Sequence, residues 1–191
     1  MKADQPRWDK RFGRKGFALG KEPNPFLKRH IHLLPKGRAL DVATGEGRNA
    51  VFLAQNGFDV DAVDISQKGL KKAQKLAREK GVKINTFLVD LDQYPIAKER
   101  YDLIANFYFL KRSLIPRIRK GLKKGGRVVF ETYLLEHKTL GVGGPKQAKY
   151  FLKPNEPLRL FRNFRILFYR EGIFREGGRR KAVASLIAEK T

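Results

Sequence analysis

The sequence predicts an α/β domain built on a mostly parallel sheet of seven strands, closed by an antiparallel hairpin at its C-terminal end. Short apolar runs alternate with longer amphipathic ones, which is the pattern of strand–helix units in a parallel sheet. The last two apolar runs are separated by Glu176-Gly177-Gly178, a turn of hairpin type. The length of 191 residues, 41% of them hydrophobic, suits a single domain over residues 1–191.

The first half of the chain predicts three strands and two helices. Gly57 ends the first helix in the way of a C-cap glycine, and Ser66 is a plausible N-cap for the second. Strands are expected over residues 38–43, 59–65 and 83–89, and helices over residues 49–56 and 67–80.

The second half predicts two more parallel strands and the closing hairpin. Pro116 suits the first turn of a helix, and Gly125-Gly126 turns the chain into the fifth strand. Residues 136–160 are rich in Gly, Pro and Lys and are expected to form an irregular insertion on the substrate side. Strands are expected over residues 101–106, 127–133, 164–174 and 181–190, and a helix over residues 114–122.

Composition excludes several classes of function. The chain has no cysteine, so it has no disulfide, no Cys-ligated zinc and no cysteine nucleophile. No apolar run reaches the roughly 18 residues that span a bilayer, so we expect a soluble, cytoplasmic protein without a membrane partner. The high charge, with no cysteine and one methionine, would fit a hot environment.

The net charge of +23 is spread along the chain. Residues 111–127 hold eight basic side chains and no acidic one, and Lys68, Lys71, Lys72 and Lys75 lie at helical spacing. Such a stripe is either the solvated face of a helix or a surface that binds a polyanion such as nucleic acid.

A glycine-bearing loop joins the first predicted strand to its helix. Asp41-Val42-Ala43-Thr44-Gly45-Glu46-Gly47 precedes Arg48-Asn49-Ala50, and glycines at this junction let the backbone approach a ligand closely. Read as Gly45-x-Gly47-x-x-Ala50, the segment also satisfies the nicotinamide-dinucleotide fingerprint. Asp64, about 20 residues further on, suits ribose hydroxyls in either case.

Two further carboxylates separate these interpretations. Asp41 lies inside the strand, where an anionic pyrophosphate has no use for an acid but the amino group of an amino-acid moiety does. Asp90, at the end of the third strand, can accept a hydrogen bond from an adenine amino group. The three carboxylates suit a cationic ligand with a ribose and an adenine, and S-adenosylmethionine has this chemistry.

The sequence resembles the class I S-adenosylmethionine-dependent methyltransferases, and within them the tellurite-resistance (TehB-like) and thiopurine-type branch. The motifs that carry the resemblance are Trp8-Asp9-Lys10-Arg11-Phe12, Glu22-Pro23-Asn24-Pro25-Phe26-Leu27, the block 39–66, Tyr101-Asp102-Leu103-Ile104 and Lys124-Gly125-Gly126. The fold implied is the Rossmann-like fold of that class. Ala43 departs from the family, because many relatives have Gly there.

The resemblance implies a cofactor site and an N-terminal segment, residues 1–36, that covers it. Asp41, Gly45 and Gly47 would hold the methionine moiety and Asp64 the ribose, while Asp90 and Leu91 would flank adenine. The implied cofactor-binding residues are Trp8, Arg11, Asp41, Gly45, Gly47, Asp64, Ile65, Asp90, Leu91 and Asn106, the last near the reactive methyl group. No metal is expected, since His30, His32 and His137 form no ligand set.

The catalytic residues are left unassigned, because methyl transfer needs no general base when the acceptor is already anionic. If a base exists, the candidates are Tyr108, Glu131, Tyr133 and His137. The glycine-rich segment 141–146 could act as a flap over the acceptor.

Four functions remain open on the sequence. The first is methyl transfer to a small molecule, either a heteroatom-bearing compound or a metalloid oxyanion. The second is methylation of RNA or another polyanion. The paired prolines of base-amino methyltransferases are missing after Asn106, which counts against adenine-N6 or cytosine-N4 chemistry. A nicotinamide-dependent oxidoreductase and a non-catalytic cofactor-binding protein are the remaining alternatives.

Overall fold

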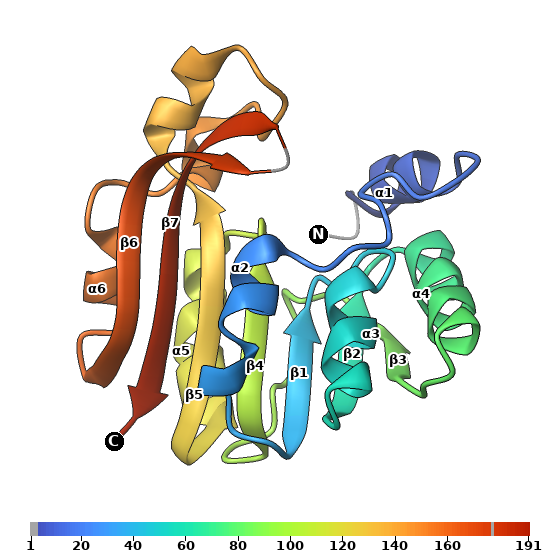
Figure 1. Ribbon diagram of the computed structural model, residues 1–191, viewed down its shortest axis with the longest axis horizontal. Coiled ribbons are helices and arrows are strands. Elements are labelled where there is room, and N and C mark those ends of the chain that lie inside the picture. Colours follow the sequence, from blue (N-terminus) through green and yellow to red (C-terminus); the bar gives the residue numbers. More distant parts are fainter. Residues whose placement is uncertain (1–3, 177) are drawn as a thin grey trace.

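One seven-stranded sheet forms the centre of the molecule in the computed structural model, which describes residues 4–176 and 178–191 (Figure 1). The strand order is β3-β2-β1-β4-β5-β7-β6. Strands β1 to β5 pair in parallel, and β7 pairs antiparallel with both β5 and β6. The strands are β1 Arg38–Val42, β2 Asp59–Asp64, β3 Asn85–Leu88, β4 Tyr101–Phe107, β5 Leu122–Tyr133, β6 Phe164–Glu176 and β7 Arg179–Lys190. The expected sheet and its closing hairpin are confirmed, while Gly177 of the expected turn lies outside the described residues.

Two of the helices, α2 and α4, begin at a residue whose side chain caps them. The side chain of Asn24 accepts from the backbone N–H of Phe26 before α2, and that of Ser66 accepts from Gly69 before α4, as predicted. Gly57, with a φ of +83°, follows the end of α3. The helices are α1 Gln5–Phe12, α2 Pro25–Arg29, α3 Arg48–Gln55, α4 Gln67–Glu79, α5 Ile115–Gly121 and α6 Glu156–Leu160, with short 3-10 turns η2 Ile31–Leu33, η3 Arg112–Leu114, η4 Leu135–Leu140 and η5 Ala148–Tyr150.

Apolar layers cover both faces of the sheet. Helices α2 and α3 lie on one face, where Phe26 and Leu53 are fully buried, and α5 lies on the other, where Ile118 is fully buried (Figure 1). Full burial of each such side chain contributes about 1.5–3 kcal/mol. A smaller apolar contact joins α3 to α4.

Strand β5 starts earlier than predicted. The sequence placed its start at Arg127, after the glycine pair, whereas the strand begins at Leu122 and runs through the pair. Leu122 pairs with Tyr101 and Arg127 with Leu103, so the glycines lie in a bulge between the two pairings. A side chain on Gly126 would meet the carbonyl oxygen of Tyr101 at 3.0 Å, which explains the glycine there.

The insertion at residues 136–160 is less irregular than expected. It contains part of η4, all of η5 and all of α6. Arg112 connects it to the domain, since its guanidinium donates to Glu156 and to the carbonyl oxygens of Lys149 and Phe151. Short helical turns of this kind have too little periodicity to be seen in the sequence. No helix in the described part of the chain is long and apolar enough to cross a membrane.

Candidate active site at the carboxyl ends of β1, β2 and β4

The loop after β1 is a tight backbone cradle. Ala43, Gly45 and Gly47 all adopt positive φ values, +54°, +57° and +82°. A Cβ atom on Gly47 would meet the Cβ of Ala73 in α4 at 2.5 Å, so only glycine fits there. The backbone therefore turns sharply onto the N-terminus of α3, which is the arrangement that favours a ligand close to the main chain.

Asp41 lies in β1 next to this loop and is almost completely buried, with 1% of its surface exposed. Thr44 Oγ1 donates a hydrogen bond of 2.6 Å to its carboxylate. Burial raises the pKa of Asp41 to about 7, an effect that the Thr44 hydrogen bond opposes. A buried carboxylate of this kind is stabilised by a cationic ligand group.

Asp64 joins the end of β2 to the same loop. One carboxylate oxygen accepts the backbone N–H of Gly45 at 2.8 Å, and the other accepts that of Ser66 at 2.8 Å. Burial raises the pKa of Asp64 although these backbone hydrogen bonds lower it. Each carboxylate oxygen has a second acceptor position, which leaves capacity for hydroxyl donors.

The sheet register places the expected site residues along one edge. Val42 pairs with Val63 of β2 and with Asn106 of β4, and Asp64 pairs with Leu88 of β3. Asp90 follows β3 and accepts the backbone N–H of Asp92 at 2.9 Å. Ile65 and Leu91 are buried and offer apolar surface beside these carboxylates.

Asn106 carries a buried acceptor without a partner. The residue is 1% exposed, and its Oδ1 has no hydrogen-bond partner within the described part of the chain. Leaving such an atom unsatisfied costs about 1–3 kcal/mol, so a native structure normally supplies a donor from a ligand or solvent. The orphaned oxygen lies at the carboxyl end of the central strand β4, where a ligand of the loop would extend.

Helix α1 lies against the glycine loop. The ring of Phe12 is buried, and a Cβ atom on Gly45 would lie 3.1 Å from it. Trp8 stacks on Phe12 with a centroid distance of 5.5 Å, and the guanidinium of Arg11 lies 5.6 Å from the Trp8 ring. Trp8 and Arg11 are thus brought beside the loop, with Phe12 as the anchor.

Asp9 makes contacts that the sequence did not predict. Its carboxylate accepts from Ser66 Oγ at 2.6 Å and from the backbone N–H of Lys68 at 3.1 Å, which attaches α1 to the first turn of α4. The residues lie 57 and 59 positions apart, and only the motif around Trp8 marked Asp9 in the sequence.

Glu46, inside the loop, was also missed. It is 2% exposed and accepts from Lys72 Nζ at 2.9 Å and from the backbone N–H of Leu19 at 3.2 Å. These two contacts of Glu46 attach α4 and the segment after α1 to the glycine loop.

On the β5 side of the site, Glu131 is the centre of a buried hydrogen-bond network. Its carboxylate accepts from Asn24 Nδ2 at 2.7 Å, Tyr108 Oη at 2.9 Å and Ser185 Oγ at 2.7 Å. The guanidinium of Arg170 lies 3.8 Å from the carboxylate of Glu131. Three elements distant in sequence, the start of α2, the end of β4 and β7, thus meet on one fully buried carboxylate.

The four candidate bases form one cluster. Tyr108 has a φ of +55°, which is a strained backbone conformation for an aromatic residue. Its ring stacks on that of Tyr133, with 4.9 Å between the ring centroids. Tyr133 contacts His137 at 4.2 Å, and Lys181 Nζ donates to the Tyr108 hydroxyl at 3.2 Å. Burial raises the pKa of Tyr133, and the charges of Arg48 and Arg11 act in the opposite direction.

His137 has both ring nitrogens engaged. Nδ1 faces the backbone N–H of Ala182 at 3.2 Å, and Nε2 faces the carbonyl oxygen of Gly143 at 2.7 Å. An N–H can only donate and a carbonyl can only accept, so the neutral Nε2–H tautomer satisfies both. His137 therefore holds the glycine-rich segment in place, and it is not available as a base in this conformation.

No group of three or more His, Cys, Asp or Glu residues that could hold a metal ion occurs in residues 4–176 and 178–191. His30 Nδ1 lies 2.9 Å from the carbonyl oxygen of Phe26.

The fold is the Rossmann-like fold of the class I S-adenosylmethionine-dependent methyltransferases. The crystal structure of TehB from Haemophilus influenzae superposes with a TM-score of 0.74 at 18% sequence identity, covering 98% of this chain and 67% of that one. The family model described as tellurite resistance protein TehB matches residues 24–175. The chain belongs to the TehB family.

Curated relatives agree with this assignment. The probable S-adenosyl-L-methionine-dependent methyltransferase TehB of Haemophilus influenzae is 26% identical over 140 residues, covering 71% of this chain and 49% of the relative. A ubiquinone biosynthesis O-methyltransferase of Idiomarina loihiensis is 27% identical over 157 residues, covering 71% and 63%. The chain spans about half the length of the TehB relative.

S-adenosylmethionine is therefore the cofactor that the site has to suit, and the residues suit it. The site offers buried carboxylates that can accept from a cationic amino group and from ribose hydroxyls, and an unpartnered amide oxygen. It also has a loop whose backbone adopts positive φ values. The family assignment favours the methyltransferase interpretation of the glycine loop over the nicotinamide one.

Proposed function

We propose that this protein transfers a methyl group from S-adenosylmethionine to a small acceptor through an anionic heteroatom. The observation that carries the proposal is the pair of buried carboxylates, Asp41 and Asp64, at the ends of adjacent parallel strands around a glycine cradle. A dinucleotide carries negative charge to this loop, whereas S-adenosylmethionine carries positive charge, which the two acids stabilise.

Each residue has a distinct part in holding the cofactor. Asp41 faces the ammonium group of the methionine moiety, while the backbone of Gly45 and Gly47 approaches its carboxylate. Asp64 accepts from the ribose hydroxyls with the lone pairs that its two backbone hydrogen bonds leave open.

The other expected cofactor-binding residues enclose the remainder of the cofactor. Ile65 and Leu91 form the apolar walls of the adenine site, and Asp90 accepts from the adenine amino group. Asn106 Oδ1 gains a partner at the end of β4. Trp8 and Arg11 of α1 cover the bound molecule.

The acceptor side of the site supports an anionic acceptor. The aromatic cluster holds the buried carboxylate of Glu131, and three cations lie around it, since Lys181 donates to Tyr108 and the charges of Arg11 and Arg48 reach Tyr133. Such groups concentrate a small anion and hold it near the cofactor. The family description, tellurite resistance, favours a metalloid oxyanion, and the name of the ubiquinone biosynthesis O-methyltransferase relatives favours an oxygen acceptor.

When bound, S-adenosylmethionine would supply a methyl group on a sulfonium sulfur, with a neutral thioether as the leaving group for in-line attack by the acceptor lone pair. The acceptor then loses one negative charge and no proton has to move. The task of the chain is positioning, which accounts for a site without an available histidine base.

A methyl-transfer assay tests the proposal. Protein and radiolabelled S-adenosylmethionine are incubated separately with tellurite, a phenol and a thiol, and labelled product is measured. We expect turnover with at least one of these acceptors, at a pH where the phenol and the thiol are ionised, and its loss in Asp41→Asn. Cofactor binding without transfer to any of the three would contradict a small anionic acceptor.

A further inference from the structure

A strongly basic surface lies beside the cofactor loop. Segments 4–21 and 66–83 contain 13 basic and three acidic residues, so most of this charge has no acidic partner within them. They contain helices α1 and α4, which lie together (Figure 1), joined by the Asp9 contacts and by Lys72 Nζ, which donates to the carbonyl oxygen of Arg14 at 2.8 Å. We call this surface the α1–α4 face and define it by the exposed basic residues Arg7, Lys10, Arg11, Arg14, Lys15, Lys68, Lys71, Lys75 and Arg78.

Most basic side chains of the other basic segment, residues 111–127, are paired with acidic side chains or backbone carbonyls of the domain. Four of its cations pair with acidic side chains, and a fifth donates to two backbone carbonyls. The acidic pairs are Lys111–Asp92, Arg112–Glu156, Lys123–Asp102 and Arg127–Glu189, and Arg117 donates to Leu91 and Tyr94. The density of charge in this segment therefore overstates its free surface charge, whereas most basic residues of α1 and α4 are exposed.

The α1–α4 face also presents an aromatic ring between cations. Trp8 is half-buried, and the guanidinium groups of Arg7 and Arg11 lie 5.3 Å and 5.6 Å from its ring centroid. Cations that follow a phosphate backbone, together with an aromatic ring on which an unpaired base stacks, are the features that bind single-stranded nucleic acid.

A membrane surface suits this face less well. The apolar side chains of α4, among them Leu70, Leu76 and Ala77, are buried against the domain. A helix that binds a bilayer by its side needs an exposed apolar face to insert, and α4 presents lysines instead.

We propose that the α1–α4 face binds single-stranded nucleic acid, with phosphates on the lysines of α4 and a base on the face of Trp8 opposite Phe12. This binding is a property of the surface and does not depend on the acceptor of the methyl group.

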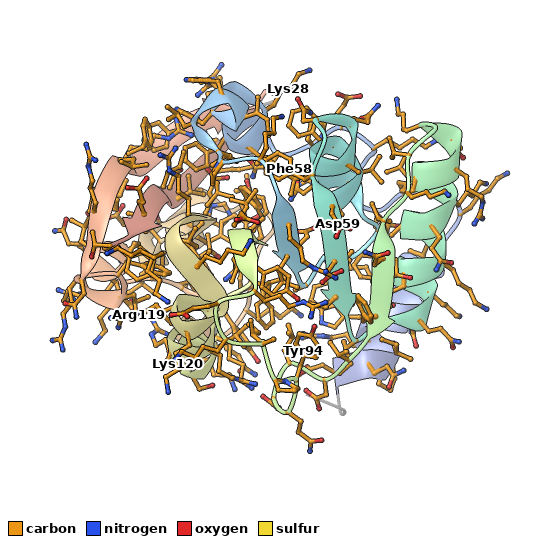
Figure 2. All side chains as sticks on the ribbon, turned by 90° about the horizontal axis from the view of Figure 1, so that it is seen from below. Lys28, Phe58, Asp59, Tyr94, Arg119 and Lys120 are labelled. Atoms are coloured by element: carbon orange, nitrogen blue, oxygen red, sulfur yellow. The ribbon has the colours of Figure 1, made fainter. Side chains whose placement is uncertain are left out.

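The test is fluorescence anisotropy with a labelled single-stranded RNA of about 20 nucleotides, long enough to cover one site. The variant Lys68→Glu/Lys71→Glu/Lys75→Glu changes the α1–α4 face and leaves Lys72, which holds Glu46, in place. The control Lys98→Glu/Lys120→Glu/Lys124→Glu alters net charge equally with exposed residues on and beside α5. Figure 2 shows Lys120 on α5, on the opposite side of the sheet from Lys28 of α2.

We expect the α4 variant to weaken binding at least about tenfold and to reduce the slope of log Kd against log salt by about 2, since each phosphate contact in a single strand contributes about 0.7. The control should change Kd by less than about threefold. Thermal unfolding establishes that each variant folds, and Lys68→Gln/Lys71→Gln/Lys75→Gln replaces an α4 variant that does not. Equal weakening by both triple variants, or no binding of the wild type at about 0.15 M salt, overturns the proposal.

Trp8 supplies a second readout, because it is the single tryptophan of the chain. Stacking of a base should quench its fluorescence with RNA and not with inorganic polyphosphate. Equal effects of the two polyanions would contradict stacking on Trp8. Binding to phosphatidylserine vesicles in the absence of RNA binding would assign the face to a membrane instead.

Discussion

The carboxylate of Asp64 and the backbone N–H of Gly45 form a hydrogen bond of 2.8 Å between the end of β2 and the loop after β1. The second oxygen of the same carboxylate accepts from Ser66 at the start of α4. One side chain thus sets the shape of the cradle and, in the proposed function, also binds the ribose.

Asp64→Asn tests whether the cradle depends on the two backbone hydrogen bonds that the Asp64 carboxylate accepts. Two N–H donors face opposite oxygens of the carboxylate, so the amide NH2 of asparagine must oppose one of them. We expect a loss of about 1–3 kcal/mol in the free energy of unfolding, measured in urea without cofactor. Asp90→Asn, at a residue that accepts one backbone N–H, is the control, and equal stability of Asp64→Asn and wild type would show that the hydrogen bond is dispensable.

Asp41 predicts a pH dependence of cofactor affinity. Its pKa of about 7 means that the carboxyl group is largely protonated below that pH in the unliganded protein. A cationic amino group requires the ionised form, so affinity for S-adenosylmethionine should rise about tenfold per pH unit up to pH 7 and level off above it. Isothermal titration in buffers of different ionisation enthalpy should detect proton release on binding near pH 6, and Asp41→Asn should abolish both effects. A pH-independent affinity in the wild type would contradict this assignment.

The same residue affects folding in the opposite direction. Because the pKa of Asp41 is raised above its unfolded value of 3.8, the folded state binds more protons between these values. The contribution of Asp41 is therefore most favourable below pH 4 and is lost as the pH rises through 7. Asp41→Asn should be more stable than wild type at pH 8 without cofactor, by urea unfolding, and a lower stability would contradict the raised pKa.

Ala43 stands where many relatives have glycine, and its φ of +54° shows the consequence. The structure accommodates the methyl group in the left-handed region, where an alanine costs about 1–2 kcal/mol. The greater freedom of glycine in the unfolded chain offsets about 0.5–1 kcal/mol. Ala43→Gly should therefore stabilise the protein by roughly 0.5–1 kcal/mol, a prediction that any decrease in the urea midpoint would contradict.

The contacts of His137 should keep the glycine-rich segment 141–146 ordered. Its ring connects the carbonyl of Gly143 to the backbone N–H of Ala182, and His137→Ala removes both contacts. We expect faster hydrogen exchange and faster tryptic cleavage at Lys146, with exchange in β1 unchanged. If the segment covers the acceptor, turnover should fall as well, whereas unchanged turnover after shortening residues 141–146 would show that it is not a flap.

The sequence predicted what local pattern determines. Apolar periodicity gave the strands of the parallel sheet, and Ser66 and Gly57 marked helix ends correctly because caps act within a few residues. The glycine loop was recognisable because its backbone conformation requires those residues.

Contacts between distant segments could not be predicted. Glu131 meets Asn24 across 107 positions, and Asp9 meets Ser66 across 57, so neither pair leaves a periodic signal. The pairing of residues 111–127 with distant acids is of the same kind, and it changed the interpretation of the charge. The early start of β5 escaped prediction because its bulge places glycines inside a strand.

The measurement that tests the central claim most directly is isothermal titration of the protein with S-adenosylmethionine, with NADH as the control ligand. The proposed site predicts saturable binding of S-adenosylmethionine at one site per chain, no heat of binding with NADH, and loss of the signal in Asp41→Asn. Binding of NADH alone, or an affinity for S-adenosylmethionine that Asp41→Asn leaves unchanged, would contradict it.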